Sequence, residues 1–208
     1  MSANAWSRLN GFRAAAHAAG LLPLAWMLLD FALHFGDYAA NRNLMLRAGS
    51  VGLILLVASF ACSPLARVLR RPQLTQMRRA LGLYGFAFVC IHLLVYLWLD
   101  NDFVLELVLR DLDERRAMAI GMAAFAALLP LALTSTAGWQ RRLGRRWRLL
   151  HKLIFVALPL SVWHYLWLDR DFNTVPLAFG AVVLALFVLR LVRRAPPVVR
   201  ATPQAPMR

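Results

Sequence analysis

Six long apolar runs dominate this 208-residue chain, and they restrict its possible folds more than any other feature. Each run has about 20 residues, and a helix of that length covers roughly 30 Å, the thickness of a bilayer's hydrocarbon core. Lipid offers no partners to backbone polar groups, so a spanning run must satisfy them within a helix. The sequence therefore predicts an all-α, polytopic membrane bundle with six transmembrane helices, at Ala14–Phe35, Leu44–Leu65, Ala80–Leu99, Ala117–Thr136, Leu149–Leu168 and Thr174–Val192.

The overall composition fits a membrane protein better than a soluble one. Hydrophobic residues make up 61% of the chain and charged residues 16%, whereas soluble domains carry about 25% charged residues. The net charge of +14 is also typical of nucleic-acid-binding proteins, whose basic residues gather on one water-exposed surface. The positions of the arginines decide between these two interpretations.

The basic residues gather in alternate connections between the predicted spans. The N-terminal segment, the second and fourth connections and the C-terminal tail hold 18 of the 24 Lys and Arg residues, and all ten acids fall on the opposite side. Cytoplasmic loops of membrane proteins carry an excess of Lys and Arg. The arginine-rich side is therefore expected to be cytoplasmic, with both termini on it. The charge is a topology signal, and we expect no nucleic-acid partner.

The chain reads as one transmembrane domain over residues 1–194. Residues 195–208 are rich in Pro and Arg, and we expect them to form a disordered cytoplasmic tail. Cys62 and Cys90 lie inside apolar runs. This position favours buried hydrophobic roles over a disulfide.

Five histidines lie in or near the predicted spans, where ionisable side chains are costly and commonly mark function. His34 lies at a helix end beside Gly36 and Asp37, and interfacial solvation accounts for it. His92 and His164 lie on the third and fifth spans, which run in the same direction, about 12 and 8 Å inside the acidic boundary. The difference is within the range of helix tilt, so the two imidazoles can face each other at one depth.

Two neutral imidazoles that face each other in a helical bundle can supply both axial ligands of a b-type haem. The chain has no Cys-x-x-Cys-His sequence, which excludes covalent c-type attachment. Two alternatives stay open, namely hydrogen bonding between helices, and another metal or a proton relay. Aromatic residues near both histidines suit a flat apolar ligand, although Trp and Tyr also belong at membrane interfaces; they are Tyr84, Phe86, Phe88, Tyr96, Trp98, Trp163, Tyr165 and Trp167.

His151 lies 13 residues before His164 on the same span, near the arginine-rich boundary. At the matching depth the third span carries Arg78 and Arg79, and His17 on the first span is the only other histidine at this level. Three interpretations of His151 stay open. It could form a second bis-histidine site with His17, it could belong to a site for a different redox cofactor, or both histidines could be interfacial residues.

Five stretches of the chain carry a family resemblance. They are Leu81–Tyr84 leading to His92, Leu131–Thr136, Leu143–His151, His164–Trp167 and the earlier His17–Pro23. Together they resemble the MsrQ family, formerly called YedZ, and the similarity covers nearly the whole chain. The family comprises haem-binding membrane subunits of the bacterial periplasmic methionine sulfoxide reductase system, within the ferric-reductase-like transmembrane group.

The resemblance implies a haem b electron-transfer subunit of the inner membrane, with the reductase chemistry in a partner. Electrons would pass from membrane quinol or a cytoplasmic flavin reductase to a molybdenum-containing periplasmic subunit, MsrP, which repairs oxidised methionine in proteins. By position, His92 and His164 would be the axial ligands of the haem iron. His151 would be a further haem-related or electron-entry residue.

Two further expectations concern the cofactors. Ferric-reductase-like proteins carry two histidines on each of two helices, whereas the third span here has only His92, so one haem is expected and a second stays open. About 16 residues follow Val192, too few for a fused flavin–NADPH module, so the donor is expected to be a separate protein or a quinol. The family has also been associated with FMN, and arginines that would suit its phosphate are Arg78, Arg79, Arg145 and Arg146.

The connection from Asp100 to Arg116 is the longest surface on the acidic side, and we expect it to help dock the periplasmic partner. A plain solvated loop is the alternative. Two other functions also stay open for the whole chain. One is a stand-alone ferric or cupric reductase core, and the other is a non-redox transporter or scaffold whose histidines relay protons. The latter has little support, because Asp30, the only acid within a span, lies near its end.

Overall fold

The computed structural model describes residues 3–168 and 174–192, and its regular structure over these residues is entirely helical. The prediction of an all-α membrane bundle is confirmed. The predicted tail at 195–208 lies outside the described residues. In chain order the helices are α1 Ala3–Leu33, α2 Tyr38–Val68, η1 Pro72–Gln76, α3 Met77–Leu99, α4 Leu105–Glu114, α5 Arg116–Leu133, α6 Ala137–Leu143, α7 Arg145–Leu150, η2 His151–Leu153, α8 Ile154–Leu168 and α9 Thr174–Val192.

Within the described part of the chain, five segments are long and apolar enough to cross a membrane. They are Gly11–Leu33, Tyr38–Val68, Pro72–Leu99, Arg116–Leu133 and Arg145–Leu168. The sixth predicted span corresponds to α9. Its apolar part, Thr174–Arg190, is shorter than the other five segments. All six predicted spans are thus helical in the structure.

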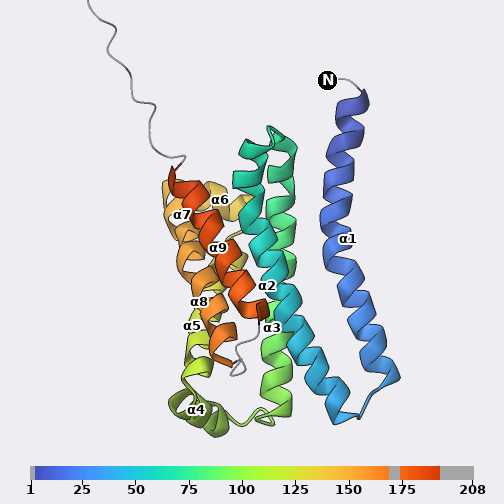
Figure 1. Ribbon diagram of the computed structural model, residues 1–208, viewed down its shortest axis with the longest axis vertical. Helices are drawn as coiled ribbons and strands as arrows, with labels where there is room; N and C mark the ends of the chain where they lie inside the picture. The colour runs from blue at the N-terminus through green and yellow to red at the C-terminus, as the bar shows by residue number, and fades with distance from the viewer. Residues whose placement is uncertain (1–2, 169–173, 193–208) are drawn as a thin grey trace, which may run out of the picture.

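The long helices run alternately up and down (Figure 1). The start of α1, the connection from α2 to α3, and the short helices α6 and α7 lie at one end, which we call the arginine-rich end. The other end, which we call the acidic end, holds the turn between α1 and α2 and the helix α4. This separation agrees with the one expected from the charges.

The helices pack mainly as two pairs, α2 with α3 and α5 with α8. One buried apolar cluster lies between α2, α5, α8 and α9, and includes Phe60, Leu128 and Leu158. A second cluster joins α1 to α2 and α3 through residues such as Met27 and Phe88. Helix α1 lies at the edge of the bundle, beside α2 and α3 (Figure 1).

Local polar groups explain where several helices begin. Helix α2 begins at Tyr38, earlier than the predicted Leu44, because the Asp37 side chain accepts a hydrogen bond from the Ala39 amide at 2.9 Å. Gly36 adopts a φ of +92°, which lets the chain reverse direction just before this cap. The predicted boundary at Leu44 was therefore wrong because it ignored this N-cap.

The connection after α3 also differs from a plain loop. Residues Leu105–Glu114 form the amphipathic helix α4, which buries Val108 and leaves Leu105 and Leu109 exposed. At the other end of the bundle, the fourth span ends at Leu133 rather than at the predicted Thr136. The Thr136 side chain accepts a hydrogen bond from the Trp139 amide at 3.3 Å and so begins α6.

Candidate functional site

The structure brings His92 and His164 together, on α3 and α8 respectively. Their ring centroids lie 6.3 Å apart and their planes cross at 79°. Both side chains are partly buried, in the half of the bundle nearer the acidic end. The expectation that parallel spans place the two imidazoles at one depth is met by this geometry.

Each imidazole is held by a backbone carbonyl of the neighbouring helix. His92 Nδ1 lies 2.9 Å from the Met45 carbonyl oxygen on α2, and His164 Nδ1 lies 2.7 Å from the Ala117 carbonyl oxygen on α5. A carbonyl oxygen can only accept, so each Nδ1 carries the proton and donates it. Each Nε2 therefore keeps a lone pair available for a metal, the arrangement usual for metal-binding histidines.

A glycine lies against each imidazole. A Cβ atom built on Gly49 would approach His92 Nδ1 to 2.9 Å, and one built on Gly121 would approach His164 Nδ1 to 2.7 Å. Both distances are shorter than carbon–nitrogen van der Waals contact, so any larger residue would displace the ring. Each glycine lies one helical turn beyond the carbonyl that binds the same histidine, on the same helix face.

The paired imidazoles fit the axial ligation of a haem. Imidazole nitrogens bind metals at about 2.0–2.1 Å. Two rings on opposite sides of one iron would then have centroids roughly 6 Å apart, and the observed separation is 6.3 Å. The neutral nitrogen donors suit haem iron. Groups of three or more His, Cys, Asp or Glu that could hold a bare metal ion are absent from the described residues.

The surrounding aromatic residues divide into two groups. Trp98, Trp163 and Trp167 are between 37% and 49% exposed and face outward, as expected of aromatic residues at a membrane interface. Phe86 on α3 stacks on Phe125 of α5, with centroids 5.7 Å apart and planes at 17°. Only some of the aromatic residues predicted to surround a flat ligand therefore lie in the bundle interior.

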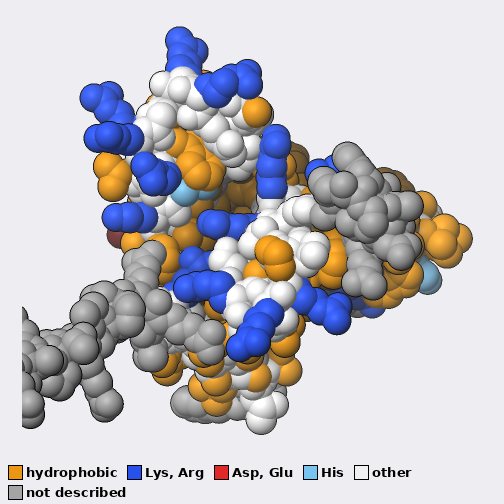
Figure 2. Space-filling model, turned by 90° about the horizontal axis from the view of Figure 1, so that it is seen from above, with side chains coloured by type: hydrophobic (Ala, Val, Ile, Leu, Met, Phe, Trp, Pro, Cys, Tyr) orange, Lys and Arg blue, Asp and Glu red, His pale blue; other side chains and the backbone are white. Residues whose placement is uncertain are grey.

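A second candidate site lies at the arginine-rich end, in a pocket between α2, α3, α5 and the segment from α7 to α8. Arg78, Arg79 and His151 line it together with Gln140 and Trp147. Most of its other lining residues are apolar, among them Leu56, Phe60, Leu83, Phe86, Leu128, Leu131 and Ile154. Figure 2 views this end and shows Lys and Arg side chains spread over it.

Trp147 connects α5 to His151 within this pocket. Its indole Nε1 donates to the Thr134 carbonyl oxygen at 2.9 Å, and its ring lies 3.9 Å from the His151 ring. His151 Nδ1 lies 3.1 Å from the Trp147 carbonyl oxygen. The Leu131 carbonyl also bonds this imidazole, so His151 is held between two backbone carbonyls, unlike His92 and His164.

The remaining predicted site residues lie elsewhere. Arg145 and Arg146 are exposed on α7 and do not line the pocket. His17 lies against α3, with its Nδ1 2.9 Å from the Tyr84 hydroxyl, and it does not line the pocket either. The structure therefore does not bring His17 and His151 together.

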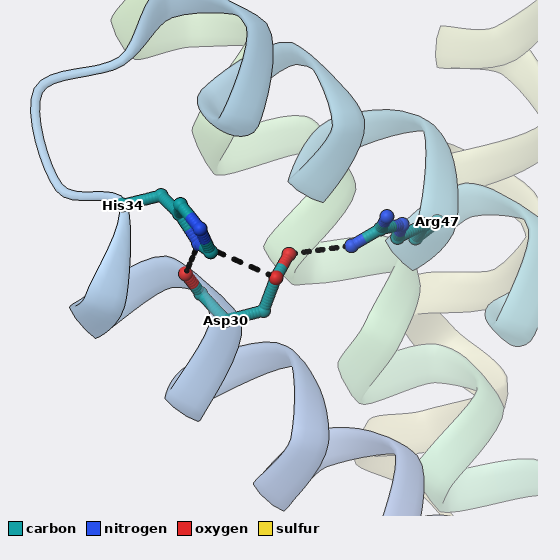
Figure 3. A network of polar contacts seen from close by, with 3 residues as sticks. All are labelled: Asp30, His34 and Arg47. Carbon is teal, nitrogen blue, oxygen red and sulfur yellow. Dashed lines mark hydrogen bonds and ion pairs between the residues drawn. The ribbon is translucent and has the colours of Figure 1, made fainter.

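His34 belongs to a polar network between α1 and α2 at the acidic end (Figure 3). Its Nδ1 lies 2.9 Å from the Asp30 carbonyl oxygen, and Arg47 Nη1 donates to Asp30 Oδ2 at 2.5 Å. The Arg47 guanidinium also lies 4.6 Å from the centre of the Trp26 ring. Asp30 is thus engaged by Arg47, which gives no support to a role for Asp30 in proton relay.

The supporting groups Met45, Gly49, Ala117 and Gly121 were not foreseen from the sequence. An internal repeat could have revealed them. The His92–Met45 and His164–Ala117 bonds each join residues 47 positions apart, with a glycine at the same place between them. Identical Tyr-Leu-Trp-Leu-Asp stretches, at 96–100 and 165–169, follow the two histidines.

Comparison with known proteins gives consistent matches. Residues 48–162 match the model of a family described as ferric reductase like transmembrane component. The protein-methionine-sulfoxide reductase heme-binding subunit MsrQ of Caulobacter vibrioides is 40% identical over 172 residues, with 81% of each chain covered. The subunit of the same name from Rhodospirillum rubrum is 39% identical over 86% of this chain and 87% of its own. That from Klebsiella pneumoniae is 36% identical over 84% of this chain and 87% of its own.

Proposed function

Because this chain belongs to the ferric-reductase-like transmembrane family, and within it to the MsrQ haem-binding subunits, we propose that it carries electrons across the inner membrane to a periplasmic methionine sulfoxide reductase. The observation that carries this proposal is the facing pair of His92 and His164, each with its Nε2 free and its Nδ1 fixed by a carbonyl. A haem b bound there supplies a one-electron iron centre.

The chain's own residues hold the two imidazoles in fixed positions. The carbonyls of Met45 and Ala117 hold the imidazoles in one tautomer and one orientation. Gly49 and Gly121 let the rings lie close against α2 and α5. Imidazoles held in this way would move little if a bound haem gained or lost an electron, which would favour fast electron transfer.

The pocket at the arginine-rich end is the proposed point of electron entry. By the positive-inside rule, this end and both termini would face the cytoplasm. Arg78, Arg79 and Gln140 offer hydrogen-bonding groups to an electron-rich ligand, and the apolar residues of the lining suit a quinol or a flavin. A bound FMN would place its phosphate at Arg78 and Arg79. Arg145 and Arg146 lie outside the pocket and would act only on the approach of a donor.

An aromatic contact joins the entry pocket to the histidine pair. Phe86 lines the pocket and stacks on Phe125, which lies one helical turn beyond Gly121. Gly121 in turn contacts His164. The proposed route would run from the pocket along this stack to His92 and His164, which would hold the haem, and from there to the acidic end. The acceptor is MsrP, the molybdenum-containing catalytic subunit, which uses the electrons to repair methionine sulfoxide in periplasmic proteins.

A reoxidation assay tests the proposed acceptor. The purified holoprotein is reduced with dithionite, freed of excess reductant, and mixed with purified MsrP and a methionine sulfoxide peptide. We expect the reduced haem signal to decay faster than with MsrP alone, because turnover of the peptide regenerates the oxidised acceptor.

Ferric citrate serves as the competing oxidant, since the family match also fits a stand-alone ferric or cupric reductase core. Fast decay with ferric citrate and none with MsrP and peptide would favour that second function and reject the first.

A further inference from the structure

The two histidines lie on opposite sides of a seam between the helix pairs. Helix α2 packs along α3 and helix α5 along α8, whereas α3 and α5 touch much less. His92 is bonded within the first pair, to Met45, and His164 within the second, to Ala117. Each ring is therefore fixed to its own pair. The apolar cluster between α2, α5, α8 and α9 joins the two pairs, and polar contacts join them again beyond the histidines, at the acidic end. The distance and angle between the rings depend on both kinds of contact.

One of these contacts begins at Tyr96. Tyr96 lies one helical turn beyond His92 on the same face of α3 and is 6% exposed. Its hydroxyl donates to Asp111 Oδ2 on α4 at 2.9 Å. The other carboxylate oxygen, Asp111 Oδ1, lies 3.4 Å from Arg115 Nε. Asp111 therefore contacts α3 and the end of α4 at the same time.

Arg115 connects this contact to the second histidine. It is the single residue between α4 and α5, and its amide donates to the Asp111 carbonyl oxygen at 2.9 Å. Its own carbonyl accepts from the Met118 amide at 2.8 Å, in the first turn of α5. That same turn contains Ala117, whose carbonyl binds His164. A continuous series of hydrogen bonds and ion-pair contacts thus links α3, which carries His92, to the first turn of α5, whose Ala117 carbonyl binds His164.

We propose that Tyr96 and Asp111 are positioning residues for the haem, which set the separation and the crossing angle of His92 and His164. This inference rests on the proposed haem site. The hydroxyl–carboxylate bond is charge-assisted and the Tyr96 side chain is buried, and both features strengthen the bond. Its loss frees the two helix pairs to shift against each other at the acidic end.

The test compares Tyr96→Phe with the wild-type holoprotein by electron paramagnetic resonance and by redox titration. Bis-histidine haems with nearly perpendicular imidazole planes give a highly anisotropic low-spin signal, and the 79° angle predicts that signal for the wild type. In Tyr96→Phe the largest g value is expected to fall and the signal to broaden, with a changed midpoint potential. If the Tyr96 hydroxyl only stabilised the fold, its removal would lower the stability of the protein. The g values and the midpoint potential would then stay unchanged.

Tyr84→Phe is the matched control. Tyr84 lies on the same helix and also loses one hydroxyl bond, to His17 on α1, but this bond does not cross the seam. We expect the wild-type signal and potential from Tyr84→Phe. Asp111→Asn keeps an oxygen that accepts from Tyr96 and is expected to resemble the wild type. Asp111→Ala loses the acceptor and is expected to resemble Tyr96→Phe.

Unchanged signal and potential in both Tyr96→Phe and Asp111→Ala would overturn the positioning role. If these two variants bind no haem, the melting temperatures of their apoproteins decide. Melting equal to that of the Tyr84→Phe apoprotein, which also loses one hydroxyl bond, supports positioning, and melting well below it overturns positioning in favour of a structural role. A wild-type protein that shows no haem signal would instead count against the proposed function, so the two failures are distinguishable.

Discussion

At the scale of single residues, the candidate haem site depends on two glycines as much as on two histidines. Helix propensity alone would favour alanine at both positions, by about 0.5–1 kcal/mol. Gly49 and Gly121 nevertheless lie in the middle parts of α2 and α5, where a Cβ would meet an imidazole at 2.9 and 2.7 Å. Space for the rings, rather than backbone flexibility, explains these glycines.

We therefore predict that Gly121→Ala and Gly49→Ala lower haem occupancy severalfold, although each substitution strengthens its helix. The added methyl group pushes His164 or His92 away from the carbonyl that orients it, so the two Nε2 atoms no longer face one iron. The measurement is haem per protein after purification, from the pyridine haemochrome spectrum.

Gly11→Ala is the matched control for this prediction. Gly11 is also helical, and a Cβ there meets nothing within 4 Å. Haem content in Gly121→Ala and Gly49→Ala equal to that of Gly11→Ala would contradict the steric account.

The sequence indicated the histidines but not their supports, for a physical reason. An ionisable side chain in an apolar run is conspicuous because burial of its charge is costly. A glycine in an apolar helix and a backbone carbonyl have no such local signal, since Gly is common in transmembrane helices. Arg145 and Arg146 were predicted as phosphate ligands from their charge, and the structure places them outside the pocket that Arg78 and Arg79 line.

At the scale of helices, prolines and arginines determine how the helices are joined. Pro64 lies inside α2 and has no amide proton, so the Phe60 carbonyl one turn earlier lacks its usual helical donor. Arg190 of α9 supplies a replacement, with Nη2 donating to the Phe60 carbonyl oxygen at 2.6 Å. The Arg190 guanidinium also lies 3.8 Å from the centre of the Phe60 ring. Helix α9 is thus fixed to α2.

Arg190→Met is predicted to destabilise the protein by about 1–3 kcal/mol, since it removes a charge-assisted hydrogen bond and a cation–π contact while keeping an apolar stem. The measurement is thermal unfolding of the purified protein in detergent. Arg67→Met serves as the control, because Arg67 bonds only the Ser63 carbonyl of its own helix, at 3.3 Å, and is exposed. Equal melting of the two variants would refute this role for Arg190.

Helix boundaries could be predicted from the sequence only in part. Hydropathy located all six apolar helices, because a run of about 20 apolar residues forms few stable structures other than a membrane-spanning helix. It missed the starts and ends that capping determines, such as Asp37 for α2 and Thr136 for α6. It also missed α4, whose ten residues mix five charged and five apolar side chains and stay short of any membrane span.

At the scale of the whole molecule, one arrangement accounts for the charges, the histidine pair and the pocket. The arginine-rich end holds the pocket with His151, and the paired histidines lie nearer the acidic end. In the described residues every ion pair that joins Asp or Glu to a basic side chain lies at the acidic end. The proposed direction of electron flow follows from this polarity.

The central claim is that His92 and His164 together hold one haem b, and its most direct test is the dithionite-reduced minus oxidised absorption spectrum. We predict a Soret band and a sharp alpha band for the wild type and for His34→Ala, whose imidazole lies away from the pair in the Asp30 network. His92→Ala and His164→Ala are each predicted to lose this signal. Haem content equal to the wild type in either variant would contradict the claim, as would a wild-type protein with no Soret band after expression with ample haem.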